Sequence, residues 1–216
     1  MIRPNADTQR YRAGYPGKRD DPDADRNYRF YCGQMKLPGY RYTIDDIHQK
    51  WFGDWATLEM QHDYIQWLFP IRELSMFNYD TQELMLHEAK RILENPQCKA
   101  RLQKSYELLL DFYGMKLVDA TTGQLARHDN FQQCYENLSY SGHNYLRITR
   151  IMKCLGELGF EHYKKPFIMH ILKEIYENNE LTPCKESCLN YWAGVLRNAD
   201  DLKEVEEYAR KKERSS

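Results

Sequence analysis

The sequence predicts an all-α fold, a single irregular multi-helix bundle with at most one short hairpin. Beyond residue 43, apolar residues recur at steps of three and four along most of the chain, which is typical of amphipathic helices. Only one short segment has strand character, and no internal repeat is evident, which disfavours a solenoid. The 216 residues are 42% hydrophobic and 13% aromatic, which is sufficient apolar material for one core.

The first 26 residues are predicted to be a disordered arm, because prolines, glycines and a charge cluster leave no apolar periodicity there. Between Tyr28 and Tyr42, aromatic residues flank a Pro-Gly step. This pattern favours an extended segment that its rings hold against the domain. The predicted organisation is therefore an arm at 1–26, one domain at 27–208, and a basic tail at 209–216.

The first predicted helix begins after Thr43, a suitable capping residue, and carries an apolar stripe that includes Trp51. Gly53 interrupts the stripe, so two helices are predicted to meet there, the second ending before Pro70. Residues 115–127 are predicted to form a short hairpin or a long loop. Later helices are predicted at about 81–95, from there to Gly114, and at 130–138, 143–158, 166–178, 185–198 and 200–214.

Charge and composition exclude several classes of protein. The 31 basic and 32 acidic residues balance, so no overall field would attract nucleic acid. No run approaches the roughly 20 apolar residues of a membrane span, and no signal peptide is evident, so we expect an intracellular protein without a membrane span. The six cysteines are expected to be reduced thiols. Cys184 and Cys188 could share a helix face, but two ligands do not make a metal site, so neither metal nor cofactor is expected.

The sequence also lacks the common catalytic signatures. It contains no glycine-rich phosphate loop, nucleophile elbow, zinc-binding histidine pair or dinucleotide fingerprint. The protein is therefore predicted not to be an enzyme. The competing hypothesis is a site assembled from distant segments, with His143, Arg150 and an acidic residue around one cavity.

The richest local cluster of candidate binding residues lies between positions 51 and 67. One interpretation is that its rings belong to the core and that an aspartate caps the second helix. The other is a ligand groove, in which rigid rings supply contact area and a carboxylate pairs with a ligand cation. The candidate residues are Trp51, Asp54, Trp55, His62, Tyr64, Gln66 and Trp67.

Two basic groups are further candidates. His143, Arg147 and Arg150 share the side of a predicted helix opposite its apolar stripe, and form a ridge for a phosphate or carboxylate or for the domain's own acidic residues. Near the end of the chain, a basic run either forms a nuclear-import signal for an import receptor or complements a helix dipole. That run consists of Arg210, Lys211, Lys212 and Arg214.

Six long sequence words stand in order along the chain: NYRFY at 27–31, WFGDW at 51–55, YIQWLFP at 64–70, LDFYG at 110–114, HNYLRITRI at 143–151 and LGELG at 155–159. Words of this length are far more specific than a short motif. Over about residues 27–208, the chain resembles the conserved N-terminal domain of the opioid growth factor receptor family, which includes receptor-like paralogues.

The resemblance implies a receptor for the opioid pentapeptide methionine-enkephalin, located in the cytoplasm, around the nucleus and within it, and linked to negative regulation of cell growth. It implies no catalytic activity and no cofactor. A peptide with a free amine and aromatic rings would require a carboxylate beside an aromatic surface, with a cation near its C-terminus. The alternative function is an intracellular scaffold or adaptor of the same fold, which binds a protein segment and has no opioid affinity.

Overall fold

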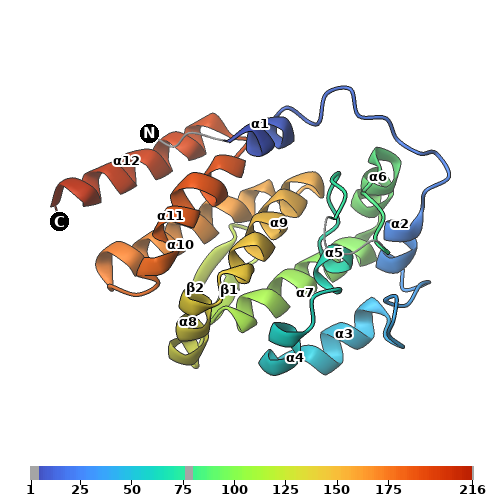
Figure 1. The fold of residues 1–216 in the computed structure, drawn as a ribbon, viewed down its shortest axis with the longest axis horizontal. Helices are drawn as coiled ribbons and strands as arrows, with labels where there is room; N and C mark the ends of the chain where they lie inside the picture. The colour runs from blue at the N-terminus through green and yellow to red at the C-terminus, as the bar shows by residue number, and fades with distance from the viewer. Residues whose placement is uncertain (1–4, 76–79, 216) are drawn as a thin grey trace. The chain divides into compact units, whose positions relative to one another are not determined.

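The computed structural model describes residues 5–75 and 80–215, and confirms the predicted all-α class with one short hairpin (Figure 1). The chain divides into two compact units. Unit 1 comprises Met1–Pro16, Tyr113–Gly156 and Phe160–Ser216, and unit 2 comprises Gly17–Phe112 and Glu157–Gly159. The organisation into an arm, one domain and a tail stays a prediction.

Unit 2 is built around its longest helix, α7. Helices α3 and α6 both pack against α7, and α2 packs against α6. The core is rich in aromatic side chains, including the fully buried Phe30, Tyr31 and Trp67. The helices of this unit are α2 (Arg26–Tyr31), α3 (Ile44–Trp51), α4 (Trp55–Met60), α5 (Ile65–Leu68), α6 (Leu86–Glu94) and α7 (Pro96–Phe112).

The break between α3 and α4 follows the predicted local chemistry. Thr43 and Asp46 form a capping box at the start of α3, in which each side chain bonds to the other residue's backbone N–H. Gly53 adopts a φ of +77°, which a residue without Cβ accommodates readily. Asp54 then caps α4 by accepting a 3.1 Å bond from the backbone nitrogen of Thr57. These contacts hold the α3–α4 corner in place.

His48 couples the α3–α7 packing to pH. Its Nε2 lies 2.8 Å from Ser105 Oγ, and burial lowers the pKa of His48 to about 4, although Asp45 acts in the opposite direction. The unfolded histidine titrates near 6.5 and so binds a proton that the folded chain excludes. We therefore expect stability to be complete above pH 6.5 and to fall by about 3 kcal/mol as the pH drops to 4.

Urea unfolding at a series of pH values checks this expectation for His48. The His48→Gln variant should lose most of the slope between pH 6.5 and 4, whereas His143→Gln, which changes an exposed histidine, should retain it. An unchanged slope in His48→Gln would show that other groups cause the acid sensitivity.

Unit 1 combines the hairpin with the remaining helices, and α12 runs along α10 (Figure 1). The strands pair antiparallel, with Met115 opposite Arg127 and Leu117 opposite Leu125, which confirms the predicted hairpin. The elements are α1 (Ala6–Arg12), β1 (Met115–Asp119), β2 (Gln124–Arg127), α8 (Phe131–Tyr140), α9 (His143–Glu157, of which all but the last residue belongs to unit 1), η1 (Glu161–Tyr163), α10 (Lys164–Glu177), η2 (Thr182–Cys184), α11 (Lys185–Ser187), the π-helical η3 (Cys188–Trp192), η4 (Ala193–Val195) and α12 (Ala199–Ser215).

The N-terminal segment differs from the predicted disordered arm. Asn5 caps α1, which carries the fully buried Tyr11 into unit 1. Tyr11 Oη donates to the backbone oxygen of Lys153 at 3.1 Å and accepts a 2.7 Å bond from Lys164 Nζ. Two buried rings, Tyr11 and Tyr15, and these distant partners hold the segment in place of a stripe of apolar residues, so the sequence shows no periodicity there.

The predicted extended segment between Tyr28 and Tyr42 also begins differently, because its first residues form α2. Further along the chain, the predicted helix at 185–198 is divided into α11, a π-helical turn and a short 3₁₀ turn. Within the described ranges, no helix has the length and apolar content needed to cross a membrane. Across the same ranges, no three potential ligands among histidine, cysteine and carboxylate side chains are grouped to hold a metal ion.

Candidate functional site

Most rings of the predicted aromatic cluster belong to the core of unit 2. Trp51 is 5% exposed, Trp67 is 1% exposed and Tyr64 is fully buried. Trp55 is half-buried, and its Nε1 donates a 2.8 Å bond to Asp111 Oδ2. A groove lined by three accessible tryptophans is therefore not what the structure contains, and the core interpretation holds for Trp51 and Trp67.

The polar members of the cluster lie nearer to the surface. Asp54 and His62 are exposed and Gln66 is half-buried. The Asp54 carboxylate accepts bonds from the backbone and the hydroxyl of Thr57, as expected of a helix cap. Asp54 therefore has a structural role as the cap of α4. A ligand-binding role for Asp54, His62 and Gln66 stays a prediction.

Two half-buried tyrosines stack on one another in this region, in addition to the exposed Phe52. Tyr40 and Tyr42 stack with ring centroids 6.4 Å apart and planes inclined at 28°. Both rings contact Trp51 edge to face, at 5.8 Å and 6.0 Å, and Trp51 in turn contacts Tyr64 at 5.5 Å. We call Tyr40, Tyr42 and the underlying Trp51 the tyrosine platform.

Groups of opposite charge flank the tyrosine platform. Burial raises the pKa of the Tyr40 hydroxyl, and the negative charge of the exposed Asp63 nearby raises it further. The same hydroxyl donates a hydrogen bond to Gln61 Oε1. The exposed Lys50 places its Nζ 4.5 Å from the centre of the Tyr42 ring, a cation–π contact. Lys50 Nζ is also 3.7 Å from Asp46 Oδ1. The platform thus has a carboxylate near Tyr40 and an ammonium group over Tyr42.

The sequence predicted that the rings of Tyr40 and Tyr42 hold their segment against the domain. It did not single them out as candidate binding residues. Their placement depends on a tight turn, in which the Leu37 nitrogen donates to the Tyr42 oxygen at 2.7 Å. The Tyr40 nitrogen donates in turn to the Leu37 oxygen at 3.0 Å. The Pro-Gly step signalled this turn. Nothing in the local sequence shows that the turn lies against α3.

The predicted cationic ridge belongs to unit 1 and is only partly exposed. His143 is exposed and Arg150 is half-buried, but Arg147 is 5% exposed and donates a 3.1 Å bond to Asn144 Oδ1. Placing Arg147 on an exposed ridge was therefore wrong, because its guanidinium bonds back to its own helix. The predicted core residues of the same helix, Ile148 and Ile151, are buried as expected.

The basic run near the end of the chain lies in the last turns of α12. Arg210, Lys211 and Arg214 are exposed, and Lys212 Nζ forms a 2.8 Å ion pair with Glu177. Import receptors read such a run in an extended tail, whereas here it is helical. The import signal stays a prediction, and its use would require this end of α12 to unwind.

Comparisons with known proteins agree with the sequence words. The family model of the opioid growth factor receptor conserved region matches residues 20–216. The chain is 39% identical to the mouse opioid growth factor receptor over 205 residues. These aligned residues make up 94% of this chain and 32% of the relative. It is 37% identical over 209 residues to the human receptor, covering 96% of this chain and 31% of the relative.

Receptor-like paralogues match equally well. The mouse opioid growth factor receptor-like protein 1 is 37% identical over 207 residues, which cover 95% of this chain and 44% of the relative. The chain thus spans less than half the length of these relatives. No solved structure matches it significantly. Because the family model covers most of its residues, the chain belongs to the opioid growth factor receptor family.

Proposed function

We propose that this chain is a non-enzymatic receptor domain that binds a short opioid peptide of the methionine-enkephalin type on the tyrosine platform. The observation that carries the proposal is a half-buried pair of stacked tyrosines, with the ammonium of Lys50 over Tyr42 and the carboxylate of Asp63 near Tyr40. A short unblocked peptide with aromatic rings carries the complementary groups. Its amine pairs with Asp63, a ring packs on Tyr40, and its C-terminal carboxylate pairs with Lys50.

The chemistry of this surface favours binding over catalysis. Tyrosine rings supply rigid contact area at little cost in side-chain entropy, and charges at each end fix the direction of the ligand. Because both charged groups are exposed, each ion pair adds only modest affinity. We infer that the receptor acts by occupancy and recruitment of other proteins, that it restrains growth, and that it resides in the cytoplasm, around the nucleus and within it. These inferences draw on the family to which the chain belongs.

Calorimetric titration with methionine-enkephalin and its N-acetylated form tests the proposal. Acetylation and Asp63→Asn should each weaken binding by about 1 kcal/mol, and together by little more than either alone, because both remove the same ion pair. Asp23→Asn, which changes an exposed carboxylate of the same unit, should leave binding unchanged. If the effects of acetylation and Asp63→Asn add, the peptide amine pairs with a group other than Asp63.

The alternative scaffold function predicts a different result in the same experiment. A domain that recognises only protein segments would give neither heat nor a thermal shift with methionine-enkephalin at high concentration. That outcome would discard the opioid ligand for this chain. The tyrosine platform would then remain a candidate surface for a segment of a larger protein.

A further inference from the structure

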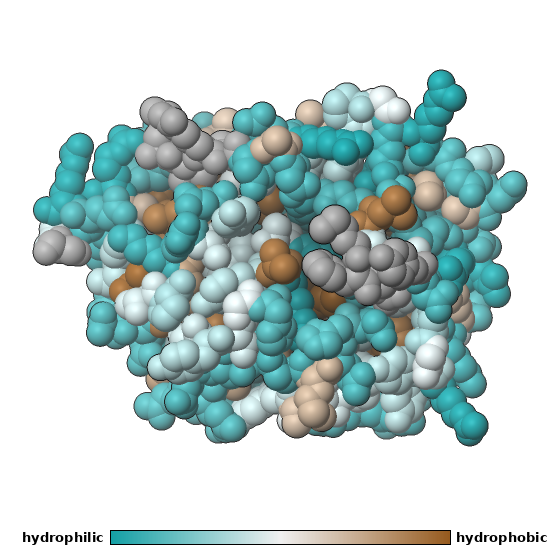
Figure 2. Space-filling view, viewed as in Figure 1, coloured by the Kyte–Doolittle hydropathy of each residue, from teal (hydrophilic) through white to brown (hydrophobic). Residues whose placement is uncertain are grey.

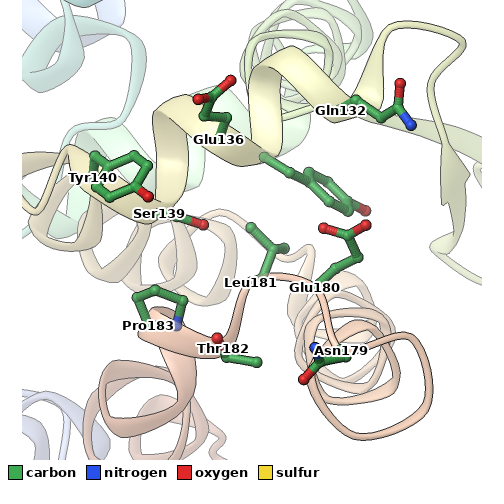
Figure 3. A pocket seen from close by; sticks show the side chains of 10 residues that line it. Gln132, Glu136, Ser139, Tyr140, Asn179, Glu180, Leu181, Thr182 and Pro183 are labelled. Carbon is green, nitrogen blue, oxygen red and sulfur yellow. The ribbon is translucent and has the colours of Figure 1, made fainter.

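We propose that a cavity in unit 1, separate from the tyrosine platform, binds an arginine side chain presented by a segment of a partner protein. The cavity is an open depression in the surface with a volume of about 390 Å³. One wall is a face of α8, and the other is the chain from Asn179 to Pro183, which leads into η2 (Figure 3). Both walls lie within unit 1.

The α8 wall carries polar and aromatic groups at helical spacing. Gln132, Tyr135, Glu136, Ser139 and Tyr140 recur at steps of three and four, which brings them to one side of the helix. Tyr135 is buried and its hydroxyl bonds to His170 Nε2 at 2.9 Å, so it forms part of the base. This wall is therefore fixed by packing beneath it.

The opposite wall has an unusual backbone. Asn179 and Leu181 have φ values of +56° and +50°, and the second is rare for a leucine. Leu181 is only 2% exposed, and Figure 3 shows Leu181 and Glu180 pointing from this wall toward α8. Burial of the leucine holds the segment in this shape, so the Glu180 carboxylate is directed across the cavity before any ligand arrives.

The charge of the cavity selects a cation. Its lining includes two carboxylates, Glu136 and Glu180, and no lysine, arginine or histidine. The charge of Arg127 acts on both Tyr135 and Glu180, but both carboxylate oxygens of Glu174 engage its guanidinium. A phosphate or another anion would meet like charge here, whereas a cationic side chain would not.

Tyr140 favours arginine over lysine. It is 84% exposed, an unusual value for a large ring, and it lies at the rim of the cavity. On the face drawn in Figure 2, hydrophobic residues appear as small separate patches among hydrophilic ones. A partner that binds such a surface therefore contacts local groups of side chains and no broad apolar area. A guanidinium is planar and can stack flat on the Tyr140 ring, and the carboxylates of the lining attract its charge.

Fluorescence anisotropy with a labelled, N-acetylated and C-amidated glycine-serine peptide that contains one central arginine tests the site. We expect saturable binding below about 1 mM, and at least about tenfold weaker binding when citrulline or lysine replaces the arginine. Glu180→Gln and Tyr140→Ala should each weaken binding at least about threefold. Glu186→Gln, an exposed carboxylate of unit 1 outside the cavity, is the matched control and should change nothing.

Three outcomes would overturn the assignment: no saturable binding, equal binding of the citrulline peptide, or an unchanged Glu180→Gln variant with a normal thermal midpoint. Equal binding of the lysine peptide would overturn the choice of arginine. The same variants separate this site from the receptor function. Asp63→Asn should weaken methionine-enkephalin and not the arginine peptide, and Glu180→Gln should do the reverse, so either proposal can fail alone.

Discussion

Replacing Glu88 with alanine is expected to lower the free energy of unfolding by about 4 kcal/mol, one of the largest effects available from a single side chain. Glu88 is fully buried, and its two oxygens accept five hydrogen bonds. Three of the donors are backbone nitrogens, those of Asn27, Tyr28 and Met85, at 2.9 to 3.2 Å. Removing the carboxylate leaves these backbone donors without their acceptor and weakens the attachment of α2 to α6.

Chemical denaturation measures the effect of Glu88→Ala directly. Glu94→Ala is the matched control, since Glu94 lies on the same helix with a side chain that is 64% exposed, and it should cost no more than about 0.5 kcal/mol. Glu88→Gln should be intermediate. The amide keeps one acceptor oxygen, but its NH2 group is a donor that would face the other donors. A loss below about 1 kcal/mol for Glu88→Ala would mean that the five bonds do not stabilise the folded state.

Replacing Gly156 with alanine is expected to destabilise the protein by about 2 to 3 kcal/mol, although alanine is the better helix former by about 1 kcal/mol. Gly156 lies inside α9, and a Cβ there would fall 2.1 Å from Tyr11 Oη and 2.4 Å from Lys164 Nζ. Lys164 is fully buried and also bonds to the Val195 oxygen at 3.1 Å. The added methyl group therefore displaces Tyr11, and with it α1.

Thermal denaturation and amide hydrogen exchange distinguish this mechanism from a general weakening. Compared with the unmodified protein, Gly156→Ala should speed the exchange of the α1 amides more than that of the α10 amides. Adding Tyr11→Phe, which removes the atom nearest to the new Cβ, should recover part of the loss. Gly142→Ala is the control, because no atom lies within 4 Å of its Cβ. A more stable Gly156→Ala protein would show that helix propensity outweighs the contact.

Local rules predicted much of the fold. The capping pair of Thr43 and Asp46, the break at Gly53 and the hairpin turn are encoded by neighbouring residues, so sequence reasoning placed the α3–α4 corner and the strands correctly. Amphipathic spacing likewise predicted α7 and α9. These features depend on contacts within a few residues of the chain.

Features that depend on distant partners could not be predicted in this way. Tyr11 is held by Lys164, 153 positions away, and Asn27 by Glu88, 61 positions away. Two tyrosines, Tyr11 and Tyr15, in a Pro- and Gly-rich segment give no period from which α1 could be inferred. Buried ionisable groups oppose the usual rule that charges lie outside, so composition alone would place Glu88 and Lys164 at the surface.

The candidate site shows the same division. Sequence reasoning singled out the aromatic residues that gather between Trp51 and Trp67, and their role in binding stays a prediction. It could not tell which rings face inward. The tyrosine platform arises because Tyr40 reaches Gln61, 21 positions away, and packs on Trp51. Ring exposure is set by tertiary packing, so the partly accessible rings include the two tyrosines, which lie outside the stretch that the sequence singled out.

Aromatic-region NMR of the protein, with ring-labelled tyrosine and increasing methionine-enkephalin, tests the central claim most directly. Occupancy of the tyrosine platform should shift the ring signals of Tyr40 and Tyr42, assigned through their Phe variants, while Tyr140 at the unit 1 cavity stays unchanged. Saturation with no change at Tyr40 and Tyr42, or with changes confined to Tyr140, would contradict the claim that the opioid peptide binds between Asp63 and Lys50.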